Sequence, residues 1–154
     1  MKQLIKQKIL FFLLVIPALS ISQVKQDTPK LRPPQMKTYW GNQSGGKISV
    51  NEIISILKTP LVVFANNKEK LHISRAIFVY RSKDAIEDEK TGEIRYRYNS
   101  SAYNFRNIDR LPEVWISFLT ESIKSGDQIH IAEIMVKNKN NEIFIAPDIR
   151  FSIE

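Results

Sequence analysis

Two histidines, His72 and His130, are the residues of this chain best suited to metal binding or proton transfer. Each lies in a run of strand-forming residues, and the chain has no Cys and no H-E-x-x-H spacing. A zinc site would therefore have to be assembled from residues far apart in the sequence. We expect two half-exposed strand histidines and no metal or cofactor site.

The other motifs of catalysis and ligand binding are absent or incomplete. No serine stands in a G-x-S-x-G turn. The stretch "SGGK" (44–47) does not complete the phosphate-loop pattern, since Ile48 follows its lysine, and no strand-like run leads into it. The acidic stretch "DAIEDEKTG" (84–92) lacks the alternating ligands of an EF-hand. We expect the glycines to let the chain turn and the acidic residues to form a solvated hairpin tip.

The stretch "RYRYNSSAYNFR" (95–106) interleaves arginine with aromatic residues, as RNA-binding sheets do. Strict alternation in a strand places Ile94, Tyr96 and Tyr98 on one face and Arg95 and Arg97 on the other. We expect the aromatic face to be buried and the arginine face to be in water. Arg95 and Arg97 are candidate partner contacts if that wet face is an interface.

The net charge of +7 does not belong to the folded part of the chain. The first 22 residues hold three lysines and no acidic residue, and residues 23–47 hold five basic residues against Asp27 alone. From Ile48 onward, fifteen basic residues are therefore matched by fifteen acidic ones. Because a nucleic-acid binder needs a basic face on the domain itself, we expect no nucleic-acid partner.

The chain begins like an exported protein. Residues 1–22 combine a lysine-rich start, the apolar run "ILFFLLVIPAL" (9–19) and small residues near its end, which predicts a signal peptide cleaved between Ser22 and Gln23. An uncleaved membrane anchor is the alternative, but this run is shorter than the roughly 20 apolar residues that a spanning helix needs. We expect a periplasmic or secreted protein with no membrane span after cleavage, stabilised without disulfides because it has no Cys.

The remaining 132 residues divide into a linker and one domain. Residues 23–38 are rich in Pro and Lys and have no apolar periodicity, which predicts an extended linker, and residues 39–154 form the domain. Tyr39 and Trp40 stand where the two meet. They either pack back on the domain edge or anchor a partner, since both types are favoured in interfaces.

Most of the domain is predicted to be β-structure. A capping box at Ser49 and Glu52 predicts a short helix over 50–57, and apolar spacing predicts a second helix between residues 109 and 125, with Pro112 in its first turn. Strand-forming runs cover 61–65, 71–82 and 94–98, with later runs up to the C-terminus separated by an Asn-rich turn and Pro147. The predicted fold is an antiparallel β-sandwich-like domain with one or two short helices.

Four stretches together resemble a known family. They are "YWGNQSGGKIS", the strand ending in "IFVYRS", "KSGDQIHIAEIMVKNKNNE" and the closing "PDIRFSI". Their order and spacing from Tyr39 to Ile153 are similar to those of the C-terminal domain of GldM (PorM in some species). This is a periplasmic component of the Bacteroidetes type IX secretion and gliding machinery.

The resemblance implies a non-catalytic module that binds other envelope proteins. Full-length members of the family join several periplasmic domains to a transmembrane helix of a proton-driven motor, whereas this sequence offers one domain behind a signal-like segment. We therefore expect an exported protein–protein interaction module that is associated with the type IX secretion or gliding machinery and has periplasmic or envelope partners. The alternative is a small secreted enzyme or ligand-binding protein that uses a cleft on the same β-sandwich.

Overall fold

The structure is a computed structural model that describes residues 34–66 and 69–154. It confirms a mostly β fold with two helices. The elements are β1 (Met36–Trp40), β2 (Gly46–Ile48), α1 (Val50–Leu57), β3 (Leu61–Ala65), β4 (Glu69–Glu87), β5 (Ile94–Arg106), α2 (Glu113–Ser122), β6 (Gln128–Lys137), β7 (Ile143–Ile145) and β8 (Ile149–Ile153). Ser22, Gln23 and most of the expected linker lie outside the described residues. In the described ranges, neither helix is long and apolar enough to cross a membrane.

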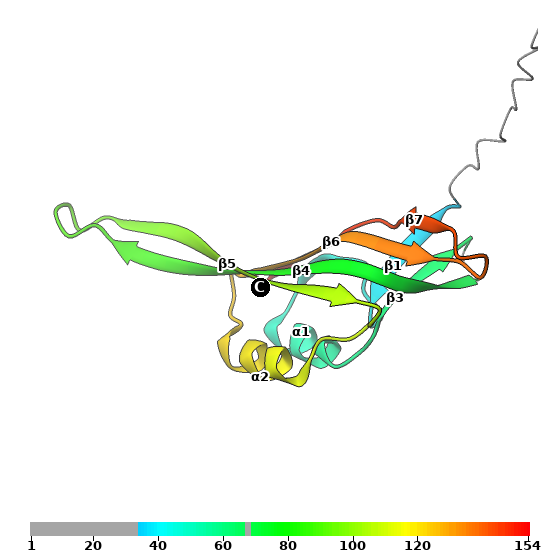
Figure 1. The fold of residues 1–154 in the computed structure, drawn as a ribbon. Helices are drawn as coiled ribbons and strands as arrows, with labels where there is room; N and C mark the ends of the chain where they lie inside the picture. Colours follow the sequence, from blue (N-terminus) through cyan, green and yellow to red (C-terminus); the bar gives the residue numbers. More distant parts are fainter. Residues whose placement is uncertain (1–33, 67–68) are drawn as a thin grey trace, which may run out of the picture. The chain divides into compact units, whose positions relative to one another are not determined.

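The strands form one curled sheet in the order β1-β3-β4-β6-β8-β2 (Figure 1). All its pairs are antiparallel except β2 with β8, which run parallel. The long strand β4 pairs first with β3 and then with β5 along one edge, and with β6 along the other. Its length therefore connects the two halves of the sheet.

Both helices lie on the same face of the sheet, below it in Figure 1. The predicted capping box of α1 is confirmed, because Ser49 N donates to Glu52 Oε2 at 3.1 Å and Glu52 N donates to Ser49 Oγ at 3.3 Å. α2 begins at Glu113, immediately after Pro112. Its buried residues are Ile116 and Leu119, which pack into the core between helices and sheet.

The sheet begins earlier than the expected domain boundary at residue 39. β1 starts at Met36, and the hydroxyl of Thr38, a buried residue, donates to the carbonyl oxygen of Pro147 at 2.7 Å. Three residues assigned to the linker therefore belong to the sheet. Proline and lysine content alone does not mark where pairing begins, since it does not report the partner strand β3.

The glycine-rich loop after β1 is a structural turn. Contrary to expectation a strand does lead into it, but the loop continues into β2, which pairs with β8, and so it does not open a helix as a phosphate loop does. Gly45 has φ +114°, and a Cβ there would lie 2.8 Å from the carbonyl oxygen of Arg150. The glycine therefore permits a close approach of two backbones that no other residue allows.

The C-terminal strands follow the prediction. Asn138 organises the turn between β6 and β7, where its Oδ1 accepts from Asn140 N at 2.9 Å and Glu142 N at 3.0 Å. Pro147 precedes β8, whose Ile149, Phe151 and Ile153 are buried.

Candidate interaction surface

The two histidines lie far apart in the sheet and build no catalytic centre. His72 is exposed on β4, and His130 lies on β6, with its Nε2 3.0 Å from Asp148 Oδ2 and 3.3 Å from Arg150 Nε. Among residues 34–66 and 69–154, no group of three or more metal-ligating side chains comes together. The surface cluster around His130 is a set of cross-strand contacts between β6, the strand β8 and the residue Asp148 just before it.

An open cleft of about 610 Å³ lies between the start of β4 and the segment before α2. Its wall combines apolar side chains such as Leu71 and Leu111 with Lys70, Asp109 and Arg110. Lys70 Nζ lies 4.0 Å from Asp109 Oδ2, and both side chains are exposed. These groups can contact a polar ligand.

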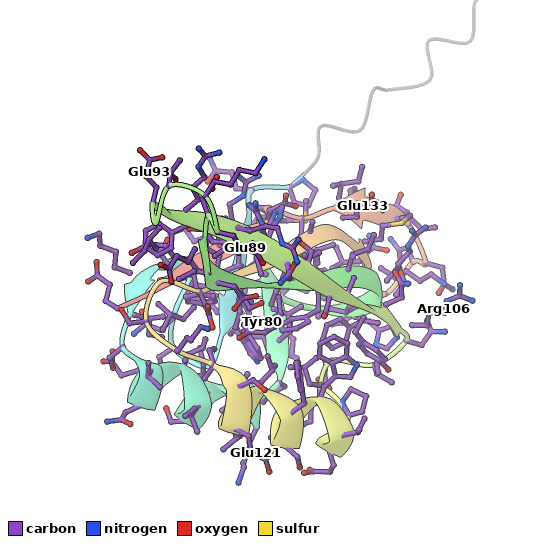
Figure 2. The ribbon with its side chains drawn as sticks, turned by 90° about the vertical axis from the view of Figure 1, so that its left-hand side faces the viewer. Tyr80, Glu89, Glu93, Arg106, Glu121 and Glu133 are labelled. Carbon is purple, nitrogen blue, oxygen red and sulfur yellow. The ribbon has the colours of Figure 1, made fainter. Side chains whose placement is uncertain are left out.

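A two-stranded arm is the most unusual part of the domain. We use "the arm" for residues 82–99, in which β4 and β5 pair with each other beyond the last β4–β6 pair, Arg81 with Gln128. It projects from the sheet to the left of Figure 1. Figure 2 views it from its tip, where Glu89 and Glu93 lie. Because the strand β4 continues to Glu87, part of the expected acidic tip lies in a strand.

The expectation of a buried aromatic face on this strand is wrong. Ile94 and Tyr96 are each 64% exposed and Tyr98 is 37% exposed. The register shows the physical reason. Tyr80, Phe78 and Ala76 point into the core, and their partners on β5 share that face. Every second residue of β5 from these partners towards the tip of the arm lies on the same face, which includes Arg97 and Arg95. The arginines are therefore on the side that continues the core face, and the tyrosines are on the opposite, outer face. Alternation is correct, but the core ends before the arm begins.

The outer face of the arm carries a strip of apolar and aromatic side chains, Ile94, Tyr96 and Tyr98, which lie beside basic side chains. Lys83 Nζ lies 4.0 Å from the ring centroid of Tyr96, and Arg81 Cζ lies 4.9 Å from that of Tyr98. Each of these diagonal cross-strand pairs contributes about 0.5–1 kcal/mol at exposed sites. The strip is thus ordered by cation–π contacts while its large apolar surface remains in water.

The core-side face of the arm carries charges. Arg95 pairs with Glu93 at 3.4 Å and with Asp88 at 3.8 Å. Asp84 accepts from Lys124 Nζ at 3.1 Å and from Asn99 Nδ2 at 2.5 Å, and these hydrogen bonds, followed by the positive charges of Lys124 and Arg97, lower the pKa of Asp84. Lys124 follows α2, so this contact connects the arm to the helix layer.

A buried carboxylate holds the base of the arm. Asp127 is 0% exposed and accepts hydrogen bonds from the Tyr80 hydroxyl at 2.6 Å, Lys83 N at 2.8 Å and Lys124 N at 2.9 Å. Figure 2 shows Tyr80 between the sheet and the helices. Burial, and then the hydrogen bond to Asp127, raises the pKa of Tyr80. Asp127, the residue just before β6, thus takes the place of a partner strand at Lys83, which lies two residues beyond the last β4 residue paired with β6.

The predicted contact residues have different outcomes. Trp40 is 2% exposed, donates through Nε1 to Thr59 O at 3.0 Å and packs edge-on against Phe78. It therefore belongs to the core, and the prediction that it anchors a partner is wrong. Tyr39 is half-buried against Phe64. Arg95 and Arg97 are exposed on the arm, away from Tyr39, so the four residues do not form one surface.

Asp127 and Val114 were not singled out from the sequence, and Phe118 was predicted only as part of the apolar face of the second helix. Asp127 has partners 3, 44 and 47 residues away, which no local pattern reports. Val114 is 73% exposed and Phe118 is 43% exposed on α2, although Phe118 has the spacing of a core position. An exposed apolar residue in a helix is identifiable only when the packing of that helix is known.

Comparison with known proteins adds no family. No protein-family model matches this chain, and no curated protein matches it.

Proposed function

We propose that this chain is an exported, non-catalytic protein–protein interaction module that contacts envelope or periplasmic proteins through its arm. The observation that carries the proposal is the exposure of Ile94, Tyr96 and Tyr98 side by side on the outer face of a hairpin outside the core. Single exposed apolar residues are ordinary, but adjacent ones on a projecting element are typical of interaction sites. Tyrosine and arginine, which both occur here, are also the side chains that most often dominate interface energies.

The resemblance to the C-terminal domain of GldM gives the class of partner. In that family this domain binds other envelope proteins, and the signal-like residues 1–22 would deliver the present chain to the same compartment. The neutral net charge of the folded part is compatible with a protein partner and does not favour nucleic acid. Association with type IX secretion or gliding components is therefore the specific form of the proposal.

Site-specific photo-crosslinking in cells tests this function. A photoreactive phenylalanine analogue replaces Tyr96 on the arm, and the matched control carries it at Lys139, an exposed residue of the turn between β6 and β7. This turn lies at the opposite end of the sheet from the arm (Figure 1). We expect a crosslinked envelope protein from position 96 and none from position 139. Equal crosslinking at both positions, or none at position 96 in cells that carry the machinery, would contradict the proposal.

The open cleft beside β4 favours one second candidate, a ligand-binding protein or small secreted enzyme. Mixed apolar and charged walls are usual in small-molecule sites. Turnover of a hydrolase substrate panel, abolished by Asp109→Ala and retained when the arm tyrosines are replaced by serine, would favour this candidate over the arm.

A further inference from the structure

The strand β5 has an unpaired edge along its whole length. In the described part of the chain it pairs with β4 alone. The amide of Lys83 points away from β5, because it donates to Asp127. Backbone groups alternate in direction along a strand, so Tyr80, Ser82 and Asp84 face β5. Their partners on β5 are odd-numbered, and the even-numbered residues Tyr98, Ser100, Ala102 and Asn104 therefore direct their N–H and C=O groups outward.

The middle of this edge lacks the usual protection against another strand. Natural edge strands are protected by charges, prolines or bulges. Arg95, Arg97 and Arg106 lie towards the ends of β5, but the stretch between Arg97 and Arg106 contains no charged residue and no proline, and its pairing to β4 is regular. These eight consecutive residues thus form a regularly paired edge, and every second one directs its N–H and C=O groups outward.

An apolar hollow lies beside this unprotected stretch. Its volume is about 380 Å³, and it is lined by Ser101 and Ala102 of β5 and by Val114, Trp115 and Phe118 of α2. Val114 and Phe118 are the exposed apolar residues of this helix. A strand added to β5 places every second side chain on the helix side of the sheet. The side chain opposite Ser101 would therefore enter the hollow.

The same face offers a positive charge at a fixed distance along the strand. Arg97 is four residues before Ser101 and shares its face, since Tyr80 and Asp84 are their partners on the core side of β4. Within the described ranges, Arg97 has no ion pair of 4.0 Å or less. An acidic side chain opposite Arg97 would be four residues after the apolar one in an antiparallel partner.

We propose that β5 and α2 form a groove that binds an extended segment of a partner protein as an added antiparallel strand. This segment carries an apolar residue for the hollow and an acidic residue four positions later for Arg97. The inference rests on the proposed function and adds the binding mode and the chemistry of the partner. A second copy is a poorer occupant, because β5 itself has three arginines and no acidic residue.

The probe is a nine-residue peptide of alternating threonine and valine with leucine at its fourth position and glutamate at its eighth. Titration into the labelled full domain is followed by amide resonances. We expect shifts at Ser100, Ala102 and Asn104 and at the indole of Trp115, with a dissociation constant on the order of 0.1–1 mM, as is usual for a short unstructured strand. A peptide with lysine in place of the glutamate should bind several-fold more weakly.

Substitutions at the edge of β5 and in the hollow test the two parts of the groove separately. Ala102→Pro removes one outward N–H and no bond to β4, so the fold is retained and binding should fall at least tenfold. Lys139→Ala, at an exposed turn residue outside the groove, is the control and should bind like the wild type, whereas Ala102→Thr, which keeps the N–H, should weaken binding less than Ala102→Pro does. Val114→Asp places a carboxylate in the hollow at a position that is 73% exposed, and should also weaken binding at least tenfold.

The alternative outcomes are distinct. Wild-type binding by Ala102→Pro, or no shifts with the peptide in millimolar excess, overturns the groove. If the edge amides instead shift with protein concentration and the domain sediments as a dimer, a second copy occupies β5 and the peptide proposal is overturned. If the peptide fails to bind while position 96 still crosslinks to an envelope protein, the groove fails and the proposed function stands. If the peptide binds and no partner is crosslinked, the proposed function fails and the peptide groove remains.

Discussion

The carboxylate of Asp127 gives the sharpest test of how the arm is held. Replacing Asp127 with alanine removes the shared acceptor of the Tyr80 hydroxyl and of the amides of Lys83 and Lys124. The site is fully buried, so in the folded state water does not replace that acceptor. We therefore expect Asp127→Ala to destabilise the domain far more than a surface substitution does.

The magnitude follows from the three hydrogen bonds. A hydrogen bond to a charged group contributes about 1.5–3 kcal/mol, and the cost of burying the carboxylate offsets part of their total. The expected loss is about 3–5 kcal/mol in the free energy of unfolding. This is a large fraction of the roughly 5–15 kcal/mol that a domain has in total. Tyr80→Phe removes one of the three bonds and should cost about 1.5 kcal/mol.

Urea unfolding followed by circular dichroism measures these losses, and hydrogen exchange locates them. The amides of Lys83 and Lys124 should lose protection in Asp127→Ala before the rest of β4 does. Asp84→Ala is the matched control, since its exposed carboxylate also contacts the region of Lys124 and its loss should leave stability close to that of the wild type. The reasoning is refuted if Asp127→Ala unfolds within about 1 kcal/mol of the wild type with unchanged exchange at Lys83.

Four further outcomes are expected. Ser49→Ala removes the cap of α1 and should lower the free energy of unfolding by about 1 kcal/mol, measured in urea, whereas Ser49→Asp should retain most of it. Gly45→Ala combines a positive φ with a clash against the backbone of β8, so its melting temperature should fall by more than that of Gly92→Ala, where the turn has space. The pKa of Tyr80 is raised in the folded domain, so folding favours the protonated hydroxyl. The stability that this hydroxyl contributes is complete below the pKa of the tyrosine in the unfolded chain, and it is lost as the pH rises through the pKa in the folded domain. Alkaline titration by ultraviolet absorbance should show this tyrosine ionising only with unfolding, and an early, reversible ionisation in the folded domain would contradict it. Mass spectrometry of the protein from the periplasm should give a chain beginning at Gln23, and a species that retains residues 1–22 would contradict cleavage.

Local patterns predicted those parts of the fold whose cause is local. The capping box at Ser49 and Glu52 fixes where α1 begins, because both hydrogen bonds lie within four residues. The asparagine turn after β6 is a second case, since Asn138 bonds to its own neighbours. The alternation of β5 is also correct as a pattern.

Parts of the fold and site that depend on distant partners were not predictable. Alternation cannot report which face of a strand is covered, and in β5 the covering elements end before Arg97 is reached. The aromatic character of Trp40 is compatible with both a core and an interface, and only its position beside Phe78 decides between them. The role of Asp127 depends on Tyr80, which is 47 residues away.

The stability of the arm has to come from its two ends and its cross-strand pairs. An isolated two-stranded hairpin is at best marginally stable in water, and the arm buries neither of its faces. At the base Asp127 bonds to Lys83 N, and at the tip Asp88 Oδ1 accepts from Lys90 N at 3.0 Å and Thr91 N at 3.2 Å. Between them, the two cation–π pairs contribute about 1–2 kcal/mol together. These contacts order the hairpin without covering Ile94 and Tyr96, so a protein that covers this strip gains the hydrophobic free energy of its burial without first having to order the backbone.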